Sequence, residues 1–243
     1  MSDSAASVDL RVVRTDDAPP DTVERLWLLM TEGERARCLR LVRDVDRRSF
    51  AITRALVRRS LSAYGPTAPA DWRFVTNAHQ CPFVEPSQAG TPPLLFNLSH
   101  TSGLVALAVT RGHRVGVDVE RVSRAVDLAV ADRHFAPAEV RDLRRLPAED
   151  QPVAFFDYWT LKESYIKARG MGLALPLGAF AFTVQPPRAP AITFVPGFDD
   201  GPSRWQFWQA WPTPQHRLSL AIERAGDDLP VVLDDVPLDT LLL

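Results

Sequence analysis

The stretch from residue 152 to residue 170 reads "PVAFFDYWTLKESYIKARG". Its apolar and aromatic residues recur at helical spacing, and Gly170 suits the position just after a helix, so the stretch predicts one long helix. Three charged residues stand out within it. On a helical wheel Lys162 falls inside the aromatic arc, whereas Glu163 and Lys167 lie at its edge.

Two interpretations fit these charges. Glu163 and Lys167 are spaced i, i+4, which suits a surface ion pair worth ~0.2–0.5 kcal/mol, and Lys162 could extend its ammonium out of the apolar arc to water. Alternatively, the helix lines a polar cleft. Glu163 would then join other carboxylates on a cation, and the lysines would contact an anionic ligand such as a phosphate.

The segments around this helix predict an α+β fold of two similar-sized halves. The expected strands are residues 8–14, 72–75, 94–100, 104–110, 113–120, 180–184, 191–195, 205–211 and 217–222. The other expected helices lie within residues 22–63 and 127–147, with a loop over residues 76–93. We expect the halves to be residues 1–112 and 113–243, with the C-terminal tail packed or loosely docked. We find no internal sequence repeat.

Composition narrows the class of protein. The chain has 243 residues, a net charge of −2, and 46% hydrophobic and 24% charged residues, as in soluble globular proteins. There is no global positive charge to attract nucleic acid. Cys38 and Cys81 lack metal-type spacing, so a reducing cytoplasm is expected. No apolar run approaches ~18 residues and no signal peptide is recognisable, so we expect no membrane partner.

The stretch "VGVDVE" at residues 115–120 brings two acids together. Alternate residues of a strand share a face, so Asp118 and Glu120 point one way while Val117 and Val119 point into a core. Two neighbouring carboxylates repel each other, and a hard cation such as Mg²⁺ between them relieves the repulsion. The alternative is an ordinary solvated face of an antiparallel strand.

The stretch "FNLSH" at residues 96–100 ends an expected strand with two polar residues. The hydroxyl of Ser99 and the imidazole of His100 could contact a phosphate or pyrophosphate. The alternative for His100 is a histidine whose hydrogen bonds are satisfied at a strand end.

Taken together, these stretches resemble the surfactin-type 4′-phosphopantetheinyl transferases. The motifs are F-N-L-S-H, G-V-D-V-E and W-x-L-K-E-S-x-x-K, with 45 residues from Asp118 to Glu163. The resemblance extends over residues 34–184 and includes "GMGLALPLGAFAFTV" at residues 170–184. It implies two α+β halves related by a pseudo-twofold axis, with coenzyme A in the cleft between them.

The resemblance also implies a reaction. A serine hydroxyl of an apo carrier protein attacks the β-phosphorus of coenzyme A, the phosphopantetheine arm is transferred, and adenosine 3′,5′-bisphosphate leaves. The carrier would belong to nonribosomal peptide, polyketide or fatty acid synthesis, with secondary metabolism included. We expect the carrier to dock near residues 122–135, and we expect the enzyme to be a cytoplasmic monomer.

The resemblance assigns roles to individual residues. Mg²⁺, or Mn²⁺, would be held by Asp118, Glu120 and Glu163. The catalytic residues would be Glu163, as a candidate base, with Lys167 and Asp118. The coenzyme A phosphates would be contacted by Ser99, His100, Lys162, Lys167, Arg48 and Arg37.

One stretch departs from the family pattern. Before the F-N-x-S-H strand the family carries G-K-P or G-R-P, whose basic residue contacts the phosphates. Here residues 80–82 read "QCP", which puts Gln80 in the glycine position and Cys81 in the basic position. We therefore expect weaker affinity for coenzyme A, unless Arg73 or another basic residue supplies the contact.

Two other functions compete with the transferase. A catalytically silent module that binds coenzyme A or a carrier protein would be expected to lack a metal ligand, and all three acids are present. A different Mg²⁺-dependent phosphotransferase would be expected to carry a Walker-type or kinase glycine loop, and the sequence has neither.

Overall fold

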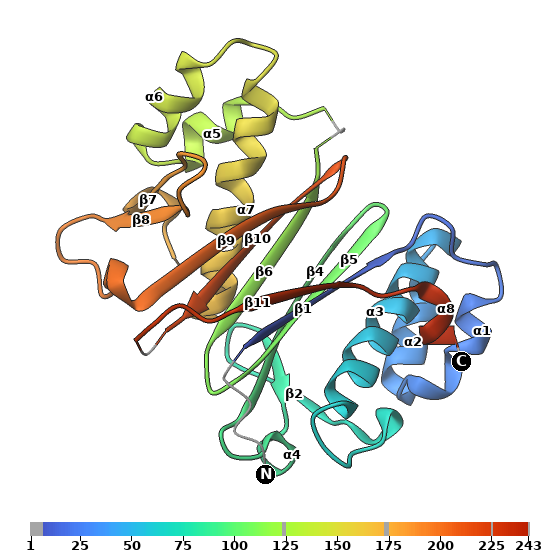
Figure 1. Cartoon of the computed structure of the whole chain (residues 1–243). Coiled ribbons are helices and arrows are strands. Elements are labelled where there is room, and N and C mark those ends of the chain that lie inside the picture. Colours follow the sequence, from blue (N-terminus) through green and yellow to red (C-terminus); the bar gives the residue numbers. More distant parts are fainter. Residues whose placement is uncertain (1–6, 123–124, 173–174, 225, 243) are drawn as a thin grey trace.

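Two β-sheets face each other at the centre of the molecule, and helices cover their outer faces (Figure 1). This computed structural model describes residues 7–122, 125–172, 175–224 and 226–242. The first sheet has the strand order β11-β1-β5-β4, and the second has the order β6-β10-β9. The predicted α+β class is confirmed.

The first half follows the chain from β1 to β5. Its strands are β1 (Val8–Arg14), β2 (Phe74–Thr76), β3 (Pro82–Val84), β4 (Leu94–Thr101) and β5 (Leu104–Arg111). Its helices are α1 (Thr22–Arg25), α2 (Glu32–Arg40), α3 (Asp44–Ser62) and α4 (Pro86–Ala89), with 3-10 turns η1 (Trp27–Leu29) and η2 (Pro69–Asp71). The stretch expected to be a loop therefore contains β3 and α4.

The second half runs from β6 onward. Its strands are β6 (Val115–Arg121), β7 (Phe180–Thr183), β8 (Ala191–Phe194), β9 (Trp205–Thr213) and β10 (His216–Glu223). Its helices are α5 (Ala129–His134), α6 (Pro137–Arg145) and α7 (Gln151–Arg169), with 3-10 turns η4 (Leu177–Ala179) and η5 (Pro202–Arg204). The long expected helix is confirmed as α7, whereas the helix expected over 127–147 is divided into α5 and α6.

The two halves have the same topology, although the sequence shows no internal repeat. Each contains a strand, a 9-residue helix, a 19-residue helix, a two-stranded ribbon and a β-hairpin. Each hairpin pairs back onto the first strand, so β1-β5-β4 corresponds to β6-β10-β9. Arg14 opposes the first residue of β5 and Arg121 opposes the first residue of β10, which aligns β1 with β6 residue by residue.

The C-terminal segment returns to the first half. Strand β11 (Val231–Asp235) pairs in parallel with β1, and α8 (Leu238–Leu242) follows it. Leu241 and Leu242 are buried in the first hydrophobic core, so the tail is packed. The expected boundary of residues 113–243 for the second half therefore needs correction, because this segment belongs in space to the first.

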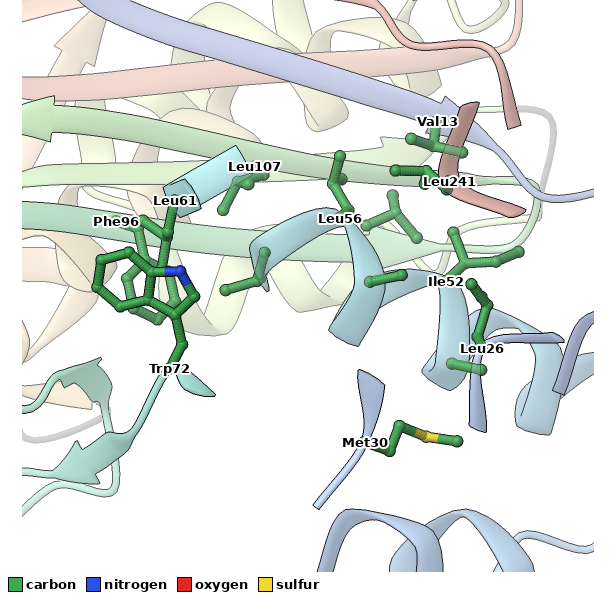
Figure 2. Packing of buried hydrophobic residues seen from close by; sticks show 14 of the residues in the cluster. Val13, Leu26, Met30, Ile52, Leu56, Leu61, Trp72, Phe96, Leu107 and Leu241 are labelled. Carbon is green, nitrogen blue, oxygen red and sulfur yellow. The ribbon is translucent and has the colours of Figure 1, made fainter. Parts of the chain in front are cut away.

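Three hydrophobic cores hold the elements together. The first lies between the helices of the first half and its sheet, where Figure 2 shows Leu56 of α3 and Leu107 of β5. The second lies under α7. The third lies between the two sheets and contains the alternate residues Val115, Val117 and Val119 of β6. Because β6 alternates, its acidic residues face away from this third core.

Candidate active site

Edge strands β4 and β6 of the two sheets lie against each other. Side chains of the F-N-L-S-H motif join these strands. Asn97 Oδ1 accepts a hydrogen bond from the backbone N–H of Val117 (3.0 Å), and Ser99 Oγ accepts one from the N–H of Val119 (3.3 Å). The motif therefore builds the joint between the halves.

Gly116 allows α7 to lie directly against β6. A Cβ atom at this position would lie 2.0 Å from the carbonyl oxygen of Ser164 and 2.4 Å from the backbone nitrogen of Ala168. Such distances are far below van der Waals contact, so only glycine permits this approach. The close packing brings Glu163 and Lys167 of α7 to the acidic face of β6.

Lys167 occupies the centre of a buried polar cluster. Its Nζ atom donates to Asp118 Oδ1 (2.7 Å), to Ser99 Oγ (2.9 Å) and to the carbonyl oxygen of Val117 (3.2 Å). Ser99 Oγ in turn donates to Asp118 Oδ1 (2.9 Å). The Ser99 hydroxyl is buried and makes three hydrogen bonds, so it helps to position Lys167 and Asp118, and its predicted phosphate contact stays a prediction.

The three predicted metal ligands lie within electrostatic range of one another. Burial raises the pKa of Glu163, the charges on Asp118 and Glu120 raise it further, and Lys167 opposes them. Asp118 Oδ2 is buried and has no hydrogen-bond partner among the described residues. An unsatisfied carboxylate oxygen among other carboxylates fits a hard cation with oxygen ligands. Among the described residues, however, no three Asp, Glu, His or Cys side chains are arranged closely enough to hold a metal ion.

Two pockets lie near this cluster, although Asp118 and Glu120 line neither of them. A pocket of about 300 Å³ is lined by Glu163 and Lys167 on one side and by residues 79–82 on the other. A pocket of about 530 Å³ lies between α3 and the end of β4. Both pockets include Arg54 and Leu98 in their lining, so they adjoin and together make up the cleft. A long ligand with phosphates near its middle can lie along it.

Two of the predicted phosphate-binding residues line the larger pocket. His100 stands at the end of β4 and Arg37 on α2. Burial lowers the pKa of His100, and the nearby charges of Lys167 and Arg54 lower it further. His100 at neutral pH is therefore a hydrogen-bonding group and not a fixed cation.

Arg48 does not enter this cleft, which corrects one prediction. It lines a separate pocket of about 740 Å³ that also contains Leu28 and Leu39. The physical reason is helical geometry, since Arg48 and the cleft-facing Phe50 lie two residues apart on α3 and point in different directions.

Arg54 is the functional candidate that sequence reasoning missed. It lines both cleft pockets, its guanidinium lies 4.9 Å from the ring centroid of Phe50, and it is 3.7 Å from a carboxylate oxygen of Glu34. Its i, i+4 spacing from Phe50 was visible in the sequence. That signal could not be used without knowing which face of the helix meets the cleft.

Lys162 has a structural role, which corrects another prediction. Its side chain is 0% exposed, and Nζ lies 2.8 Å from a carboxylate oxygen of Glu139. The ammonium also donates to the carbonyl oxygens of Leu177 and Phe180, both at 2.8 Å. Burial lowers the pKa of Lys162 and raises the pKa of Glu139, against their mutual attraction. A coenzyme A phosphate cannot reach this group.

The departure at residues 80–82 lies directly over the small pocket. Gln80 has φ +63°, a left-handed conformation that suits the glycine of the family pattern. Cys81 is half-buried, and burial raises the pKa of its thiol while Lys167 lowers it. Arg73 is absent from the lining of both cleft pockets and pairs with Glu85 at 3.1 Å, so Arg54 is the better substitute for the missing basic residue.

Comparison with known proteins identifies related enzymes. A model of the 4′-phosphopantetheinyl transferase superfamily matches residues 114–221. The 4′-phosphopantetheinyl transferase HetI of Nostoc sp. is 35% identical over 65% of this chain and 67% of that relative. The chain belongs to this family. The transferase is also 30% identical to the 4′-phosphopantetheinyl transferase Sfp of Bacillus subtilis, over 65% of this chain and 68% of Sfp.

One more distant relative matches over a longer part of the chain. A phosphopantetheinyl transferase of Thraustochytrium sp. is 28% identical over 87% of the transferase and 76% of that relative. The crystal structure of the holo-[acyl-carrier-protein] synthase of Thermotoga maritima covers 46% of the transferase and 65% of that chain, at 22% identity and a TM-score of 0.37.

The family establishes the class of reaction. The transferase moves a 4′-phosphopantetheine group from coenzyme A to a carrier protein. Among the described residues no helix is long and apolar enough to cross a membrane.

Proposed function

We propose that the transferase attaches the 4′-phosphopantetheine arm to a serine of an apo carrier protein with Mg²⁺, or Mn²⁺, held by Asp118, Glu120 and Glu163. The observation that carries this proposal is the unpartnered Asp118 Oδ2, buried beside two further carboxylates. When bound, the metal would neutralise pyrophosphate charge and stabilise the leaving phosphate. The three side chains supply only oxygen ligands, as a hard cation requires.

The remaining residues of the cleft suit the rest of coenzyme A. Arg37, Arg54 and His100 line the larger pocket and would receive the adenosine bisphosphate end. The side chain of Lys167 is 28% exposed and lines the small pocket, so Lys167 can balance charge on the transferring phosphoryl group. The pantetheine arm would leave the small pocket on the side of Gly170 and Gly172.

The transfer step balances with one proton acceptor. The carrier serine Oγ forms a bond to the β-phosphorus, and the bond from that phosphorus to the bridging oxygen breaks. Adenosine 3′,5′-bisphosphate leaves with the bridging oxygen. Glu163, whose pKa is raised by burial, accepts the serine proton directly or through water. A carboxylate that also binds a cation is a weak base, so the ligand role of Glu163 is the stronger part of this assignment.

One assay tests the proposal. The transferase is incubated with an apo peptidyl or acyl carrier protein, coenzyme A and Mg²⁺, and the carrier is examined by intact mass. The phosphopantetheine adduct should appear, should disappear with a chelator, and should be absent for Glu163→Gln, whose circular dichroism should match wild type. A wild type that binds coenzyme A without modifying any carrier would be the silent module. A Glu163→Gln protein that unfolds would favour a purely structural ion pair.

We also propose a monomer in the cytoplasm that serves nonribosomal peptide, polyketide or fatty acid carriers. One chain supplies both walls of the cleft, and both cysteines are free thiols. The proposed carrier surface remains residues 122–135, of which residues 123 and 124 lie outside the described residues. Phe135 is buried, whereas Val126 and Leu128 are half-buried and partly accessible.

A further inference from the structure

The turn between β2 and β3 reaches from the first half to the second. Asn77, at the start of this turn, donates a hydrogen bond from Nδ2 to the carbonyl oxygen of Gly170 at 2.9 Å. Gly170 follows α7, 93 residues further along the chain. The bond therefore joins the two walls of the cleft.

The other end of the same amide shapes the turn. Asn77 Oδ1 accepts hydrogen bonds from the backbone N–H groups of His79 (2.8 Å) and Cys81 (3.0 Å). The backbone also closes the turn, because Asn77 N–H donates to the carbonyl of Cys81 and Gln80 N–H donates to the carbonyl of Asn77. The oxygen of the Asn77 amide thus holds the turn together, while the nitrogen ties the turn to α7.

The two segments that this bond joins both line the small pocket. The turn contributes His79, Gln80 and Cys81, and α7 contributes Glu163 and Lys167. Lys167 is also close enough to Cys81 for its charge to lower the pKa of the thiol. The Asn77 bond therefore acts at the part of the cleft where Glu163 and Lys167 would meet the pyrophosphate.

Gly170 is suited to receive this bond. It has φ +63° as the left-handed residue after α7, and its N–H donates back to the carbonyls of Ile166 and Lys167. Its carbonyl oxygen is turned towards Asn77. A Cβ atom at this position would lie 3.4 Å from Asn77 Nδ2, an ordinary contact distance, so it is the left-handed backbone that favours glycine here.

We propose that Asn77 is a positioning residue for coenzyme A binding, because its bond to Gly170 holds the 77–81 turn closed over the small pocket. This inference rests on the proposed function. Without the bond, coenzyme A must itself order the turn when it binds, and the apparent affinity falls by the fraction of molecules in which the turn is open. The chemical step is unaffected once coenzyme A is bound.

Two substitutions remove the hydrogen bond to Gly170 and keep an acceptor for the hydrogen bonds within the turn. Asn77→Asp keeps an acceptor for the N–H groups of His79 and Cys81 but cannot donate to Gly170. Asn77→Ser is uncharged, and its hydroxyl can accept from the turn but is too short to reach Gly170. Losing one neutral hydrogen bond worth ~1 kcal/mol should raise the KM for coenzyme A about fivefold, with kcat within about twofold of wild type.

Gln88 provides a matched control within the first half. Its Oε1 accepts from the N–H of Arg73 (2.7 Å) and its Nε2 donates to the carbonyl of Asp71 (3.0 Å), so one amide again joins two backbone groups. Gln88→Glu makes the same chemical change without touching the cleft. Its KM for coenzyme A should stay within about twofold of wild type.

The experiment measures KM and kcat by carrier modification, and the Kd of coenzyme A by calorimetry, for wild type and the three variants. A rise in KM and Kd for both Asn77 variants supports the proposal. A rise for Asn77→Asp alone indicates charge repulsion and overturns it, as does an equal rise for Gln88→Glu or no rise at all. A wild type that binds coenzyme A but modifies no carrier refutes the proposed function, while the calorimetric comparison still decides the role of Asn77.

Discussion

The two halves have the same topology but differ in how the long helix meets its sheet. In the second half α7 packs directly on β6 and β10, whereas in the first half α3 packs mainly on β5. The residue of β1 that corresponds to Gly116 is Asp9, whose carboxylate accepts a hydrogen bond from the Tyr64 hydroxyl. A side chain at this position keeps the helix away from the strand. The absence of one side chain in β6 therefore lets helix and strand form a site.

The chemistry is present in only one of the two related positions. Asp118 and Glu120 of β6 correspond to Arg11 and Val13 of β1. The outer edge of β6 lies against β4, whereas the outer edge of β1 is paired with β11. The C-terminal strand thus covers the edge of β1 that corresponds to the edge of β6 beside β4. The fold is repeated, but the proposed active site occurs once.

Both halves contain a buried ion pair that belongs to the framework of the fold and not to the proposed active site. Each 19-residue helix carries one buried cation that pairs with a glutamate of the preceding 9-residue helix, Arg58 with Glu34 (2.9 Å) and Lys162 with Glu139 (2.8 Å). Each glutamate also accepts a backbone N–H at the start of its own helix. Each cation donates to backbone carbonyls near the 3-10 turn that precedes the two-stranded ribbon. The counterpart of Lys162 is Arg58, which lies in the half that lacks the proposed metal-binding acids. The role of Lys162 is therefore to join helices.

The largest expected effect tests this shared element. Lys162→Met leaves the fully buried Glu139 without its cation and should lower the free energy of unfolding by about 3–5 kcal/mol. Arg58→Met should cost less, about 2–3 kcal/mol, because Glu34 is 16% exposed and has Arg54 at 3.7 Å. Urea unfolding of both variants gives the comparison. If Lys162→Met has normal stability but a raised KM for coenzyme A, Lys162 contacts a phosphate as the sequence predicted, and the structural role is wrong.

The next largest effect tests the difference between β6 and β1. Asp118→Asn should reduce kcat/KM for carrier modification by roughly 10²–10³, because it removes a charge that would act on the transition state in a buried site. The unfolding free energy should change by less than ~1 kcal/mol, because losing the ion pair with Lys167 is offset by relief of the repulsion between Asp118 and Glu163. Lys167 also keeps its hydrogen bonds to Ser99 and Val117. Arg11→Gln, at the corresponding position of β1, should leave activity within about twofold. Equal losses of kcat/KM in Asp118→Asn and Arg11→Gln would show that catalysis is not confined to the β6 position.

A smaller effect is expected where the helix approaches the strand. Gly116→Ala places a methyl group against the backbone of α7 and should cost about 1–3 kcal/mol of stability. The kcat should fall even where the protein remains fully folded, because α7 can relieve the clash only by moving Glu163 and Lys167 away from Asp118. Gly178→Ala is the control, since no atom lies within 4 Å of the added Cβ. A Gly116→Ala enzyme with normal kcat would show that close packing is not required.

Local pattern was sufficient for much of the fold and for the centre of the site. Alternation in "VGVDVE" places Asp118 and Glu120 on one face of a strand regardless of what surrounds it, and β6 has this arrangement. Helical spacing likewise fixes the length of α7 and its end before Gly170. The three motifs together identified the family.

The errors concern features that depend on partners distant in sequence. The ammonium of Lys162 is buried because Glu139 lies on another helix, and no local pattern contains that pair. Preferring Arg54 to Arg48 required knowing which face of α3 meets the cleft. The return of β11 to β1 joins strands more than 200 residues apart in the chain, which periodicity alone does not reveal.

The smallest effect concerns the charge that the turn at residues 80–82 lacks. Cys81→Lys would place an ammonium at the edge of the small pocket and should lower the KM for coenzyme A about two- to fivefold, as expected for a partly solvated ion pair. The gain should shrink as ionic strength rises. If Arg54 already fills the role, Cys81→Lys alone will do little, but it will recover affinity in an Arg54→Gln background. A lysine that helps in neither background would place the coenzyme A phosphates away from this turn, nearer to Lys167.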